Sequence, residues 1–507
     1  MKKISLLIPI IFLTLSSGRA QTVTDVVRYS TENLQGTARY QALSGAFGAL
    51  GGDISAIHVN PAGSAVFSYS KSTLSATDFI YNNTTSYFDN EENTKDGDIK
   101  LNQIGGVFVF DMDRDAAFKK ITLGLSYEQS NNLNNEFFAR GTSNISVDNY
   151  FLSYANGVRL EDLQNLSAPT LGENYLNIGA ELGYPYQQAF LGYWAGVIEP
   201  ADPLNPANVN YISNGVYNTV TQDYLYVSEG HNSKFTLNLA TQYKENFYFG
   251  ASFNFHSLNY DNYREFSELD YDPASSLQVV YFDNLLSTRG NAVSFNVGGI
   301  ARIHKRFRVG VSYQSPIWWF KLTDEFSQRI NTNIPDGDLS TINFNLINVF
   351  PDYKLQVPSK LTGSFATIFG KHGLISFDYD YQDFSKSRLK PESDPYFELQ
   401  NNLISTRLKS VSTFRIGGEY RTLSTKRLSI RAGYRLQDSA YTNGESVSDL
   451  TGYSFGLGYN FGGTQLDTSF NQYNRSQIHQ LFDPGLPNTT AVDGKNTNVT
   501  LSLSIRL

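Results

Sequence analysis

The last ten residues of the chain alternate strictly between polar and apolar side chains. Residues 498–507 read NVTLSLSIRL, with an apolar residue at every odd position from Val499 to Leu507. A two-residue period places all of these apolar side chains on one face of a β-strand. Since the strand runs to the last residue, we expect another part of the chain to close the edge of its sheet. A barrel whose last strand pairs with its first does so, as in bacterial outer-membrane proteins. A soluble all-β array is the alternative.

The first twenty residues have the pattern of an export signal. Lys2 and Lys3 precede an apolar stretch from Ile4 to Leu15, and Gly18-Arg19-Ala20 forms a small-x-small cleavage site. The apolar stretch is shorter than the roughly 20 residues of a membrane-spanning helix. We therefore expect residues 1–20 to be a cleaved signal peptide and the mature chain to reside in the outer membrane of a Gram-negative bacterium. An uncleaved signal anchor is the weaker alternative.

Composition excludes several classes of function. Beyond the signal, no apolar run is long enough for a transmembrane helix, while 35 Phe and 33 Tyr fit lipid-facing strands with aromatic girdles. The formal charge of −8 becomes −11 once Lys2, Lys3 and Arg19 are removed, so nucleic acid is not an expected partner. The chain has no cysteine, and its six histidines lack a His-x-x-x-His spacing. We therefore predict no metal site, no cofactor and no catalytic residues.

Alternating segments recur in pairs that are joined by short polar turns. Residues 232–243 and 247–260 form one such pair, joined by Lys244-Glu245-Asn246. Long polar connections separate the pairs, and this one-sided difference in loop length is typical of outer-membrane barrels. We predict about fourteen strands, an even number as such barrels require, at residues 66–81, 98–111, 119–131, 232–243, 247–260, 291–303, 307–319, 358–369, 373–384, 411–422, 427–438, 451–461, 466–476 and 495–507.

The largest connection covers about residues 132–231. Its segment 134–147 resembles a strand, but counting it gives an odd number, so we assign it to the surface loop. After Pro185, a favoured first helical residue, apolar side chains recur at helical spacing. Their stripe either captures a hydrophobic ligand or, as we favour, packs the loop onto the barrel rim. The residues proposed for ligand capture are Tyr186, Phe190, Tyr193 and Trp194.

Two further features concern aromatic and turn residues. Trp318 and Trp319, which follow Pro316, are predicted to lie in the interfacial aromatic girdle, with ligand contact as the alternative. Asn60-Pro61 is a turn signal, because proline fixes its own φ and biases Asn60 to an extended conformation. This turn either gates the lumen or leads into the first strand, and Asn60 is suited to hydrogen-bond an opened wall.

The segment before the first strand differs from the rest of the chain. Residues 36–65 are small and rich in glycine, without two-residue alternation. Such a segment can pack inside a barrel of this size, whose lumen must be filled or left as a channel. A disordered leader is the alternative, and the many Ala, Leu and Phe residues argue against it.

Four motifs in this segment carry a resemblance to a known family. Ala38-Arg39, residues 43–47 (LSGAF), residues 52–56 (GDISA) and residues 60–63 (NPAG) are similar to the N-terminal hatch of FadL-like (OmpP1/FadL/TodX) outer-membrane transporters. The departures are Ser44 where methionine is usual, Gly52 before a single Asp53, and Ser64 where leucine is common. Later stretches also resemble this family, at residues 310–316, 357–361, 377–381, 415–420 and 431–434.

The resemblance implies an all-β fold: a closed, antiparallel, 14-stranded transmembrane β-barrel (residues 66–507) with an N-terminal hatch (residues 21–65) in its lumen. Family members pass apolar solutes from an extracellular groove into the lumen and then sideways through a gap in the wall into the bilayer. A dry, plugged lumen suits an apolar solute, which gains nothing from a water-filled pore. The residues implied for the hatch and its gating are Gly45, Phe47, Asp53, Asn60, Pro61, Ala62 and Gly63.

The expected function is therefore passive uptake of hydrophobic small molecules, either long-chain fatty acids or aromatic compounds. The expected partners are outer-membrane lipid and the hydrophobic ligand. One alternative is a barrel that serves as a structural subunit of an outer-membrane assembly or secretion complex, with the long loop docking other envelope proteins. A third, weaker hypothesis is an outer-membrane enzyme.

Overall fold

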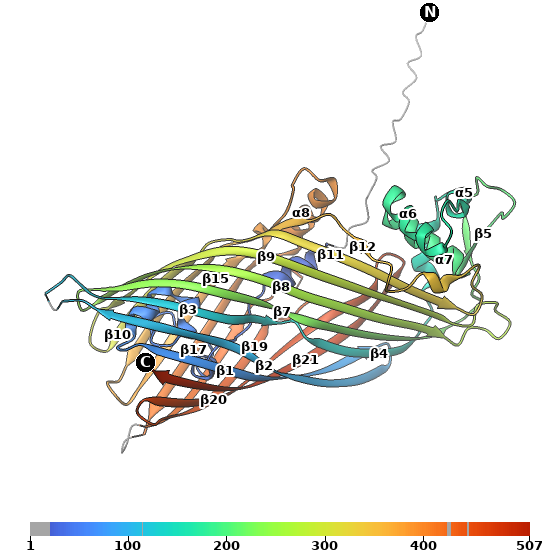
Figure 1. Cartoon of the computed structure of the whole chain (residues 1–507). Helices are drawn as coiled ribbons and strands as arrows, with labels where there is room; N and C mark the ends of the chain where they lie inside the picture. The colour runs from blue at the N-terminus through green and yellow to red at the C-terminus, as the bar shows by residue number, and fades with distance from the viewer. Residues whose placement is uncertain (1–20, 114, 423–426, 444–445) are drawn as a thin grey trace, which may run out of the picture.

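The alternating segments pair into one closed antiparallel barrel, with helices inside it and a helical lobe at one end (Figure 1). The computed structural model describes residues 21–113, 115–422, 427–443 and 446–507; the predicted signal peptide lies outside them. Closure is made by β1 (Lys71–Tyr87) and β21 (Leu486–Arg506), which pair from Lys71–Arg506 to Ser86–Ala491. The predicted all-β barrel, with its last strand on its first, is confirmed.

Some strands of the wall are interrupted, but the wall still contains fourteen strand courses. β3 and β4 both pair with β7, β10 and β11 both pair with β9, and β12, β13 and β14 follow one another along β11 and β10. The short β16 pairs with β13 beside the circle. Counting each interrupted course once gives the predicted number, 14. The strands between β1 and β21 are β2 (Asn90–Asp111), β3 (Phe118–Asn132), β4 (Asn135–Ser143), β7 (Val220–Tyr243), β8 (Phe247–Leu269), β9 (Val280–Arg302), β10 (Phe307–Gln314), β11 (Ile317–Thr332), β12 (Asn348–Val349), β13 (Tyr353–Val357), β14 (Lys360–Ile368), β15 (Gly373–Asp383), β16 (Arg388–Lys390), β17 (Ser410–Arg421), β18 (Leu428–Gln437), β19 (Leu450–Asn460) and β20 (Thr464–Phe482).

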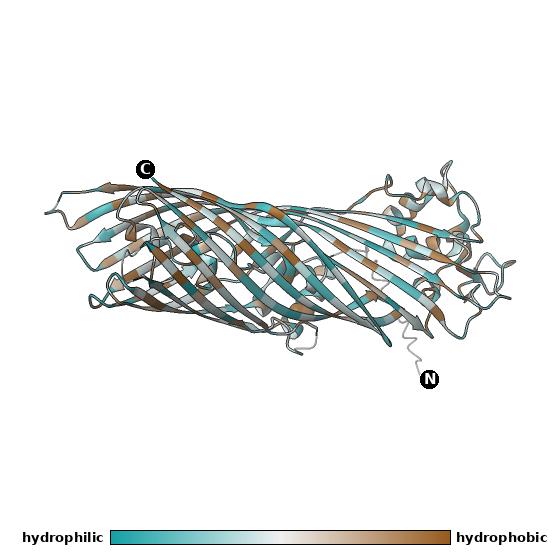
Figure 2. Ribbon diagram, turned by 90° about the horizontal axis from the view of Figure 1, so that it is seen from below, coloured by the Kyte–Doolittle hydropathy of each residue, from teal (hydrophilic) through white to brown (hydrophobic). Residues whose placement is uncertain are grey.

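Alternation along each strand separates lipid-facing from lumen-facing side chains. In β21, Leu501 is 53% exposed on the outer face, whereas its neighbour Thr500 is fully buried inside. Figure 2 shows the resulting alternation of apolar and polar bands along the wall. The polar inner side chains hydrogen-bond across the seam of the barrel, as Thr77 Oγ1 does with Thr500 Oγ1 at 2.7 Å. The apolar face contacts lipid, and the polar face forms hydrogen bonds inside the lumen.

Several strands run further toward the long-loop end than the alternation predicts. β7 begins at Val220 and not at residue 232, and β20 continues to Phe482 while β21 begins at Leu486, so the two strands together occupy most of residues 477–494, which lie between the last two predicted strands. A membrane-spanning β-strand needs only about 9–11 residues, whereas β7 has 24. Above the lipid, the outer face meets water and needs no apolar residues, so the sequence pattern fades while the strand continues.

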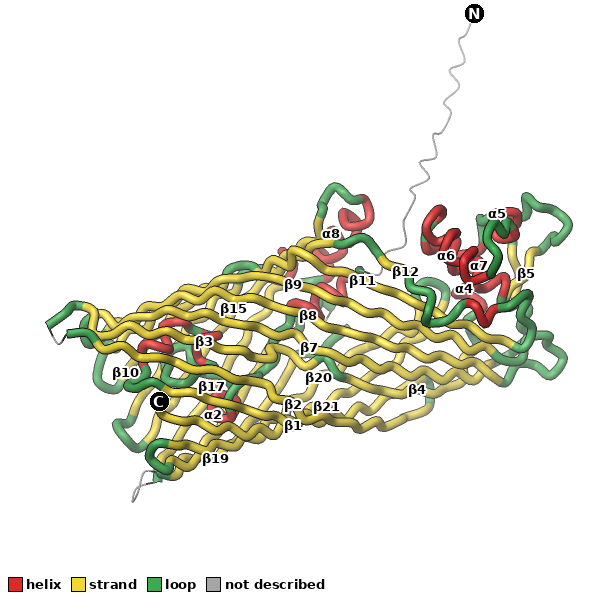
Figure 3. The backbone as a smooth tube through the Cα atoms, viewed as in Figure 1, coloured by secondary structure: helices red, strands yellow, loops and turns green. Residues whose placement is uncertain are grey.

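The N-terminal segment lies inside the barrel, where it forms short helices (Figure 3). These are α1 (Val23–Ser30), α2 (Ala38–Ala42), α3 (Ala56–Val59) and the 3-10 helix η1 (Pro61–Val66). Nearly every side chain between residues 34 and 65 is buried. We refer to residues 21–65 as the hatch. Within the described residues, no helix is long and apolar enough to cross a membrane.

The longest loop forms a helical lobe at the extracellular end. It contains α4 (Asp148–Ala155), α5 (Leu160–Gln164), α6 (Leu171–Leu182), α7 (Tyr184–Trp194) and the small hairpin of β5 (Ile198–Pro200) and β6 (Tyr211–Ser213). Its core is continuous with aromatic residues of the upper barrel, including Phe282 and Phe482. A second loop contributes α8 (Pro395–Arg407). Short 3-10 turns occur at Leu339–Thr341 (η2) and Phe384–Lys386 (η3).

Two sequence predictions need correction. The segment 134–147 is not wholly loop, because β4 pairs with β7 along the course that β3 began. β4 lengthens an existing strand course, so the number of strand courses stays even. Trp319 is not in the outer girdle: it is 1% exposed and packs inside the barrel with Leu322 and Leu355. Successive strand residues face opposite sides, and it is Trp318 that lies outside, near Phe295.

Candidate functional site

The Asn60-Pro61 turn fixes the hatch against the barrel wall. Asn60 Nδ2 donates to the carbonyl oxygens of Gly48 (2.8 Å) and Gly299 (3.1 Å), and its Oδ1 accepts from the amide of Ala62 (3.1 Å). The Pro61 carbonyl accepts from Asn238 Nδ2 at 3.0 Å. The turn therefore joins the hatch to β7 and β9 as well as leading toward β1.

Glycines in the wall make this close approach achievable. A Cβ atom at Gly250 of β8 would overlap the Pro61 carbonyl, and one at Gly298 of β9 would overlap the Asn60 amide oxygen. Ala62 is fully buried between them and β7, and the carbonyl of Gly63 accepts from the Gly52 amide at 3.0 Å. Backbone therefore packs directly on backbone at this side of the lumen.

The other hatch residues named from the sequence hold its internal fold. Phe47 is fully buried, 5.4 Å from the Tyr40 ring. Gly45 has φ +79°, a conformation that disfavours a side chain, and a Cβ there would press on Leu34 and Tyr40. Asp53 accepts hydrogen bonds from Thr37 Oγ1 (2.8 Å) and the Ser55 amide (3.0 Å).

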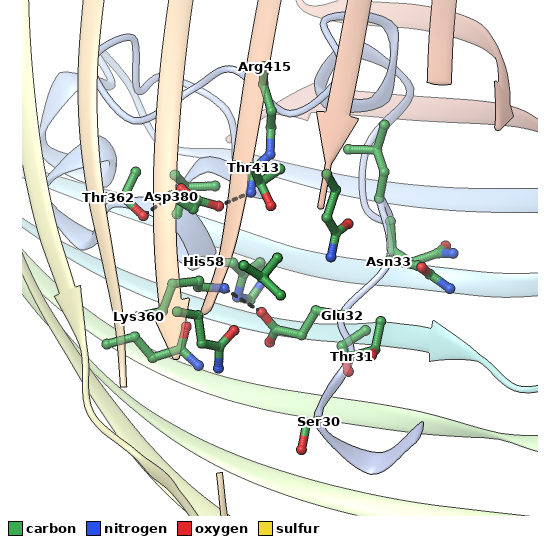
Figure 4. A pocket seen from close by; sticks show the side chains of 18 of the residues that line it. Ser30, Thr31, Glu32, Asn33, His58, Lys360, Thr362, Asp380, Thr413 and Arg415 are labelled. Carbon is green, nitrogen blue, oxygen red and sulfur yellow. Dashed lines mark hydrogen bonds and ion pairs between the residues drawn. The ribbon is translucent and has the colours of Figure 1, made fainter. Parts of the chain in front are cut away.

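Above this plug, the hatch crosses a polar region of the lumen. Glu32 lies between two lysines of the wall, with its carboxylate oxygens 3.0 Å from Lys234 Nζ and 2.7 Å from Lys360 Nζ. Burial by itself raises the pKa of Glu32, but Lys234 and Lys360 together hold that pKa well below its usual range. Figure 4 shows Glu32, His58 and Arg415 around this pocket.

The pocket itself is small and charged. Its volume is about 90 Å³, and its lining includes Glu32, His58, Lys234, Lys360 and Arg415. An apolar solute placed here would strip water from charged groups without replacing their hydrogen bonds, which is costly. The centre of the hatch is therefore a poor route for a hydrophobic molecule.

A much larger cavity lies between the hatch and the extracellular lobe. Its volume is about 880 Å³, within the range of small-molecule sites. We call this cavity the chamber. Its floor is α1, and its walls combine aromatic and apolar side chains with many polar groups, including the carboxylates of Asp25 and Asp483. The lining includes Arg28, Tyr150, Tyr184, Tyr226, Arg264, Leu286, Phe326, His479 and Phe482.

Arg264 is a partly buried cation in the chamber wall. Among the described residues, no carboxylate pairs with its guanidinium, and its Nε atom is buried without a hydrogen-bond partner. Its electrostatic neighbours are tyrosines, including Tyr184, Tyr224 and Tyr226. A guanidinium held among rings in this way is suited to bind an anionic group, because charge-assisted hydrogen bonds to carboxylates are strong.

The aromatic stripe predicted in the long loop lies away from the chamber lining. Phe190 is 1% exposed in the core of the lobe, Trp194 Nε1 donates to the Leu163 carbonyl at 3.0 Å, and Tyr193 accepts from Gln164 at 2.8 Å. Tyr186 is half-buried against the same core. This placement supports the packing alternative. The lobe instead reaches the chamber through Tyr150 and Tyr184, which the sequence reasoning did not single out.

The wall is incomplete between β2 and the course formed by β3 and β4. β2 and β3 pair from Asp111–Lys120 to Gln103–Glu128, and there their ladder stops. In the described chain, the rest of β2 pairs with β1 alone. The open seam lies near the lipid-facing side chains of Leu101 on β2 and Tyr127 on β3, which are 54% and 36% exposed.

The third strand course bends inward at this seam. Leu133 and Asn134 interrupt it, and β4 then lies against the inner face of β1, where Thr85 Oγ1 donates to the Phe138 carbonyl at 2.6 Å. A cavity of about 260 Å³ reaches the break at residues 131–135. It shares Arg28 and Tyr226 with the chamber, so the two cavities adjoin.

Comparison with known proteins agrees with this geometry. Residues 228–499 match the model of a family described as outer membrane protein transport protein (OMPP1/FadL/TodX). A FadL homologue of Pseudomonas aeruginosa has a similar structure, with a TM-score of 0.55 and 12% identity over 94% of this chain and 99% of that one. The Pseudomonas putida toluene transporter TodX gives a TM-score of 0.50 at 12% identity, over 94% and 100%. These likenesses concern the fold. No curated protein matches the sequence.

Proposed function

Because the chain belongs to the OMPP1/FadL/TodX family of outer membrane transport proteins, we propose that it carries hydrophobic small molecules with an acidic group from the chamber sideways into the bilayer. Membership of the family supports uptake of hydrophobic compounds across the outer membrane. The acidic group of the solute and its sideways exit are the parts that we add. The single observation that carries the proposal is the chamber, which combines an aromatic lining with an uncompensated guanidinium and adjoins a break in the wall.

The chamber favours an amphiphilic acid over a plain hydrocarbon. An aromatic hydrocarbon would bury its apolar surface but leave Arg264 without an anion. A long-chain fatty acid offers both an apolar body and a carboxylate, so each group meets a complementary one. We therefore propose long-chain fatty acids, rather than uncharged aromatic compounds, as the ligand class.

The exit is proposed at the seam between β2 and the β3–β4 course. The direct path through the hatch is obstructed by the charged pocket around Glu32, whereas the seam adjoins apolar side chains at the lipid surface. A solute that leaves through the seam passes the adjoining cavity, whose lining includes Tyr226, Asn131 and Asn132, and then reaches hydrocarbon, where its apolar surface is buried.

A reversible cross-link tests this route. The amide of Phe138 on β4 lies 3.2 Å from Thr94 Oγ1 on β2, so a disulfide in the Thr94→Cys/Phe138→Cys variant would tie β4 to β2. The chain has no cysteine of its own. We expect the oxidised variant to bind oleate normally but to transfer it into lipid vesicles at least tenfold more slowly, with recovery on reduction.

The control places the disulfide where the wall is already paired. Thr73 and Ser504 face each other between β1 and β21, with their hydroxyls 2.9 Å apart. Oxidised Thr73→Cys/Ser504→Cys protein should transfer oleate at the wild-type rate. Wild-type transfer by the oxidised Thr94→Cys/Phe138→Cys variant would rule out the seam as the exit, and absence of oleate binding by the wild type would contradict the proposed ligand class.

A further inference from the structure

Two neighbouring turns at the end opposite the lobe carry a concentration of basic side chains. The β9–β10 turn contains His304, Lys305 and Arg306, and the β14–β15 turn contains Lys371 and His372. All five side chains are exposed. These short turns lie at the same end of the barrel as the chain's carboxyl terminus (Figure 1), which is the periplasmic end in outer-membrane barrels.

Backbone hydrogen bonds hold these turns side by side. The Ile368 amide donates to the Arg306 carbonyl at 2.7 Å, which joins the first turn to the second. The Arg421 amide donates to the His372 carbonyl at 2.7 Å, which joins the second to the end of β17. The cations therefore form one continuous surface along the periplasmic rim, which we call the basic rim.

The basic rim has no acidic counterpart nearby. Within the described residues, no carboxylate forms an ion pair with Lys305, Arg306, Lys371 or His372, and Arg421 pairs only with the inward-facing Glu419. Other short turns differ: the β2–β3 turn contains Asp113 and Asp115, the β7–β8 turn contains Glu245 beside Lys244, and residues 461–463 between β19 and β20 are uncharged. Positive charge thus gathers at one side of the barrel.

An apolar groove opens in the outer wall directly beside the basic rim. Its volume is about 540 Å³, and it lies between β15, β17 and β18 with His372 at its edge. The groove exists because Gly418 and Ala432, which pair across β17 and β18, are small where Tyr420 and Ile430 beside them are large. A Cβ atom at Gly418 would approach only the Leu374 carbonyl, at 3.8 Å, so the space is open.

We propose that this groove and the basic rim together bind one anionic phospholipid of the periplasmic leaflet. An acyl chain occupies the groove over Gly418 and Ala432, and the phosphate lies against Lys371, His372 and Arg306. Charge complementarity selects an anionic head group, because each Lys or Arg near a membrane surface contributes about 1 kcal/mol of attraction to it. The exposed rings of Phe369 and Tyr420 place the site at the membrane interface.

This site is separate from the transport route. It lies on the outside of the barrel and on strands remote from the seam, so the bound lipid is not the transported solute. A lipid fixed here on one side of the barrel would set how the wall is oriented in the membrane. The proposed lipid site goes beyond the proposed transport function and does not depend on it.

Lipid retention in detergent tests the proposal. The full-length mature protein is titrated with phosphatidylglycerol or phosphatidylcholine, and bound lipid is counted by native mass spectrometry. We expect one phosphatidylglycerol to be retained in preference to phosphatidylcholine. Lys371→Gln should weaken its retention about fivefold and Arg306→Gln/Lys371→Gln about 25-fold, from about 1 kcal/mol per charge.

Two variants complete the experiment. Lys244→Gln removes an exposed cation from another periplasmic turn and should leave retention unchanged. Gly418→Leu fills the groove from outside and should reduce the retention of both lipids while the thermal unfolding temperature stays at the wild-type value. Equal retention of the two lipids by the wild type, or equal effects of Lys371→Gln and Lys244→Gln, would overturn the proposal.

Discussion

The same fourteen strand courses enclose the lower and upper halves of the lumen, but the hatch fills the lower half and a chamber remains in the upper half. In the lower half, wall glycines let the hatch backbone touch the barrel, and ion pairs such as Glu32 with Lys234 and Lys360 fix it. In the upper half a chamber of about 880 Å³ remains, and among the described residues the guanidinium of Arg264 has no carboxylate partner. Closure and binding are therefore separated by height: Glu32 pairs with two lysines where the barrel is plugged, whereas in the described part of the chain Arg264 has no carboxylate partner in the chamber above.

The largest expected effect is a loss of hatch stability in the lower half of the lumen. Glu32→Gln leaves Lys234 and Lys360 without their shared anion. Removing one partner of a fully buried ion pair costs about 3–5 kcal/mol, and the side chain of Glu32 is 23% exposed, so we expect about 2–3 kcal/mol. The loss should appear as faster hydrogen exchange in the hatch, with the strands of the barrel unchanged.

Acid should reproduce this effect in the wild type. The folded pKa of Glu32 lies well below its usual value, so its contribution is complete above the unfolded pKa and is lost as the pH falls through the folded one. The protection of hatch amides, measured against the intrinsic exchange rate at each pH, should therefore fall below about pH 4 in the wild type but not in Glu32→Gln. The same acid response in both proteins would contradict the role given to Glu32.

The second-largest effect is on ligand binding in the upper half, and we expect the stability of the protein to stay unchanged. Arg264→Gln removes the uncompensated guanidinium, and a hydrogen bond to a charged group contributes about 1.5–3 kcal/mol. We expect oleate to bind roughly 10- to 150-fold more weakly by isothermal titration calorimetry, while naphthalene binding is retained.

Arg289→Gln is the matched control, since that arginine pairs with Asp261 on the exposed outer surface. It should bind oleate as the wild type does. If Arg264→Gln weakened oleate and naphthalene equally, the guanidinium would be shaping the chamber and not recognising an anion.

The smallest expected effect comes from adding volume in the lower half. Gly250→Val places side-chain atoms where the Pro61 carbonyl lies, and overpacking of this kind costs about 1–3 kcal/mol. The displaced hatch should admit ions, which planar-bilayer recording would detect as a conductance absent from the wild type. Gly363→Val on β14, where a Cβ would meet nothing within 4 Å, should remain closed. A closed Gly250→Val protein would show that the hatch tolerates a shift without opening the lumen.

Much of the wall could be predicted from the sequence because the bilayer imposes a strict requirement on one face. Where lipid contacts the strand, as at Leu501 and Leu503, alternation is visible and the strand is found. Where the same strand rises into water, as at the start of β7, that requirement disappears and the predicted boundary stops short. The inward position of Trp319 also follows from alternation, once Trp318 is placed outside.

The chamber could not be predicted in the same way. Tyr150 and Tyr184 reach it from a loop whose position depends on how the lobe packs, and the stripe at Phe190, the strongest local signal, is used for that packing. The sequence on either side of Arg264 does not show that this arginine lacks a carboxylate partner, because its neighbours in space come from several strands. The break at Leu133 and Asn134 likewise depends on where the ladder between β2 and β3 ends.

The position of the hatch ahead of β1 has a consequence for how the protein is assembled. Ala38 donates its amide to Ser502 of the final strand at 2.7 Å, and Leu43 rests on Gly417 and Gly433 of the late strands β17 and β18. The first segment to be exported is therefore wrapped by the last ones to arrive. Once β21 has joined β1 the strands surround this segment, so insertion must enclose its own contents as the cylinder shuts.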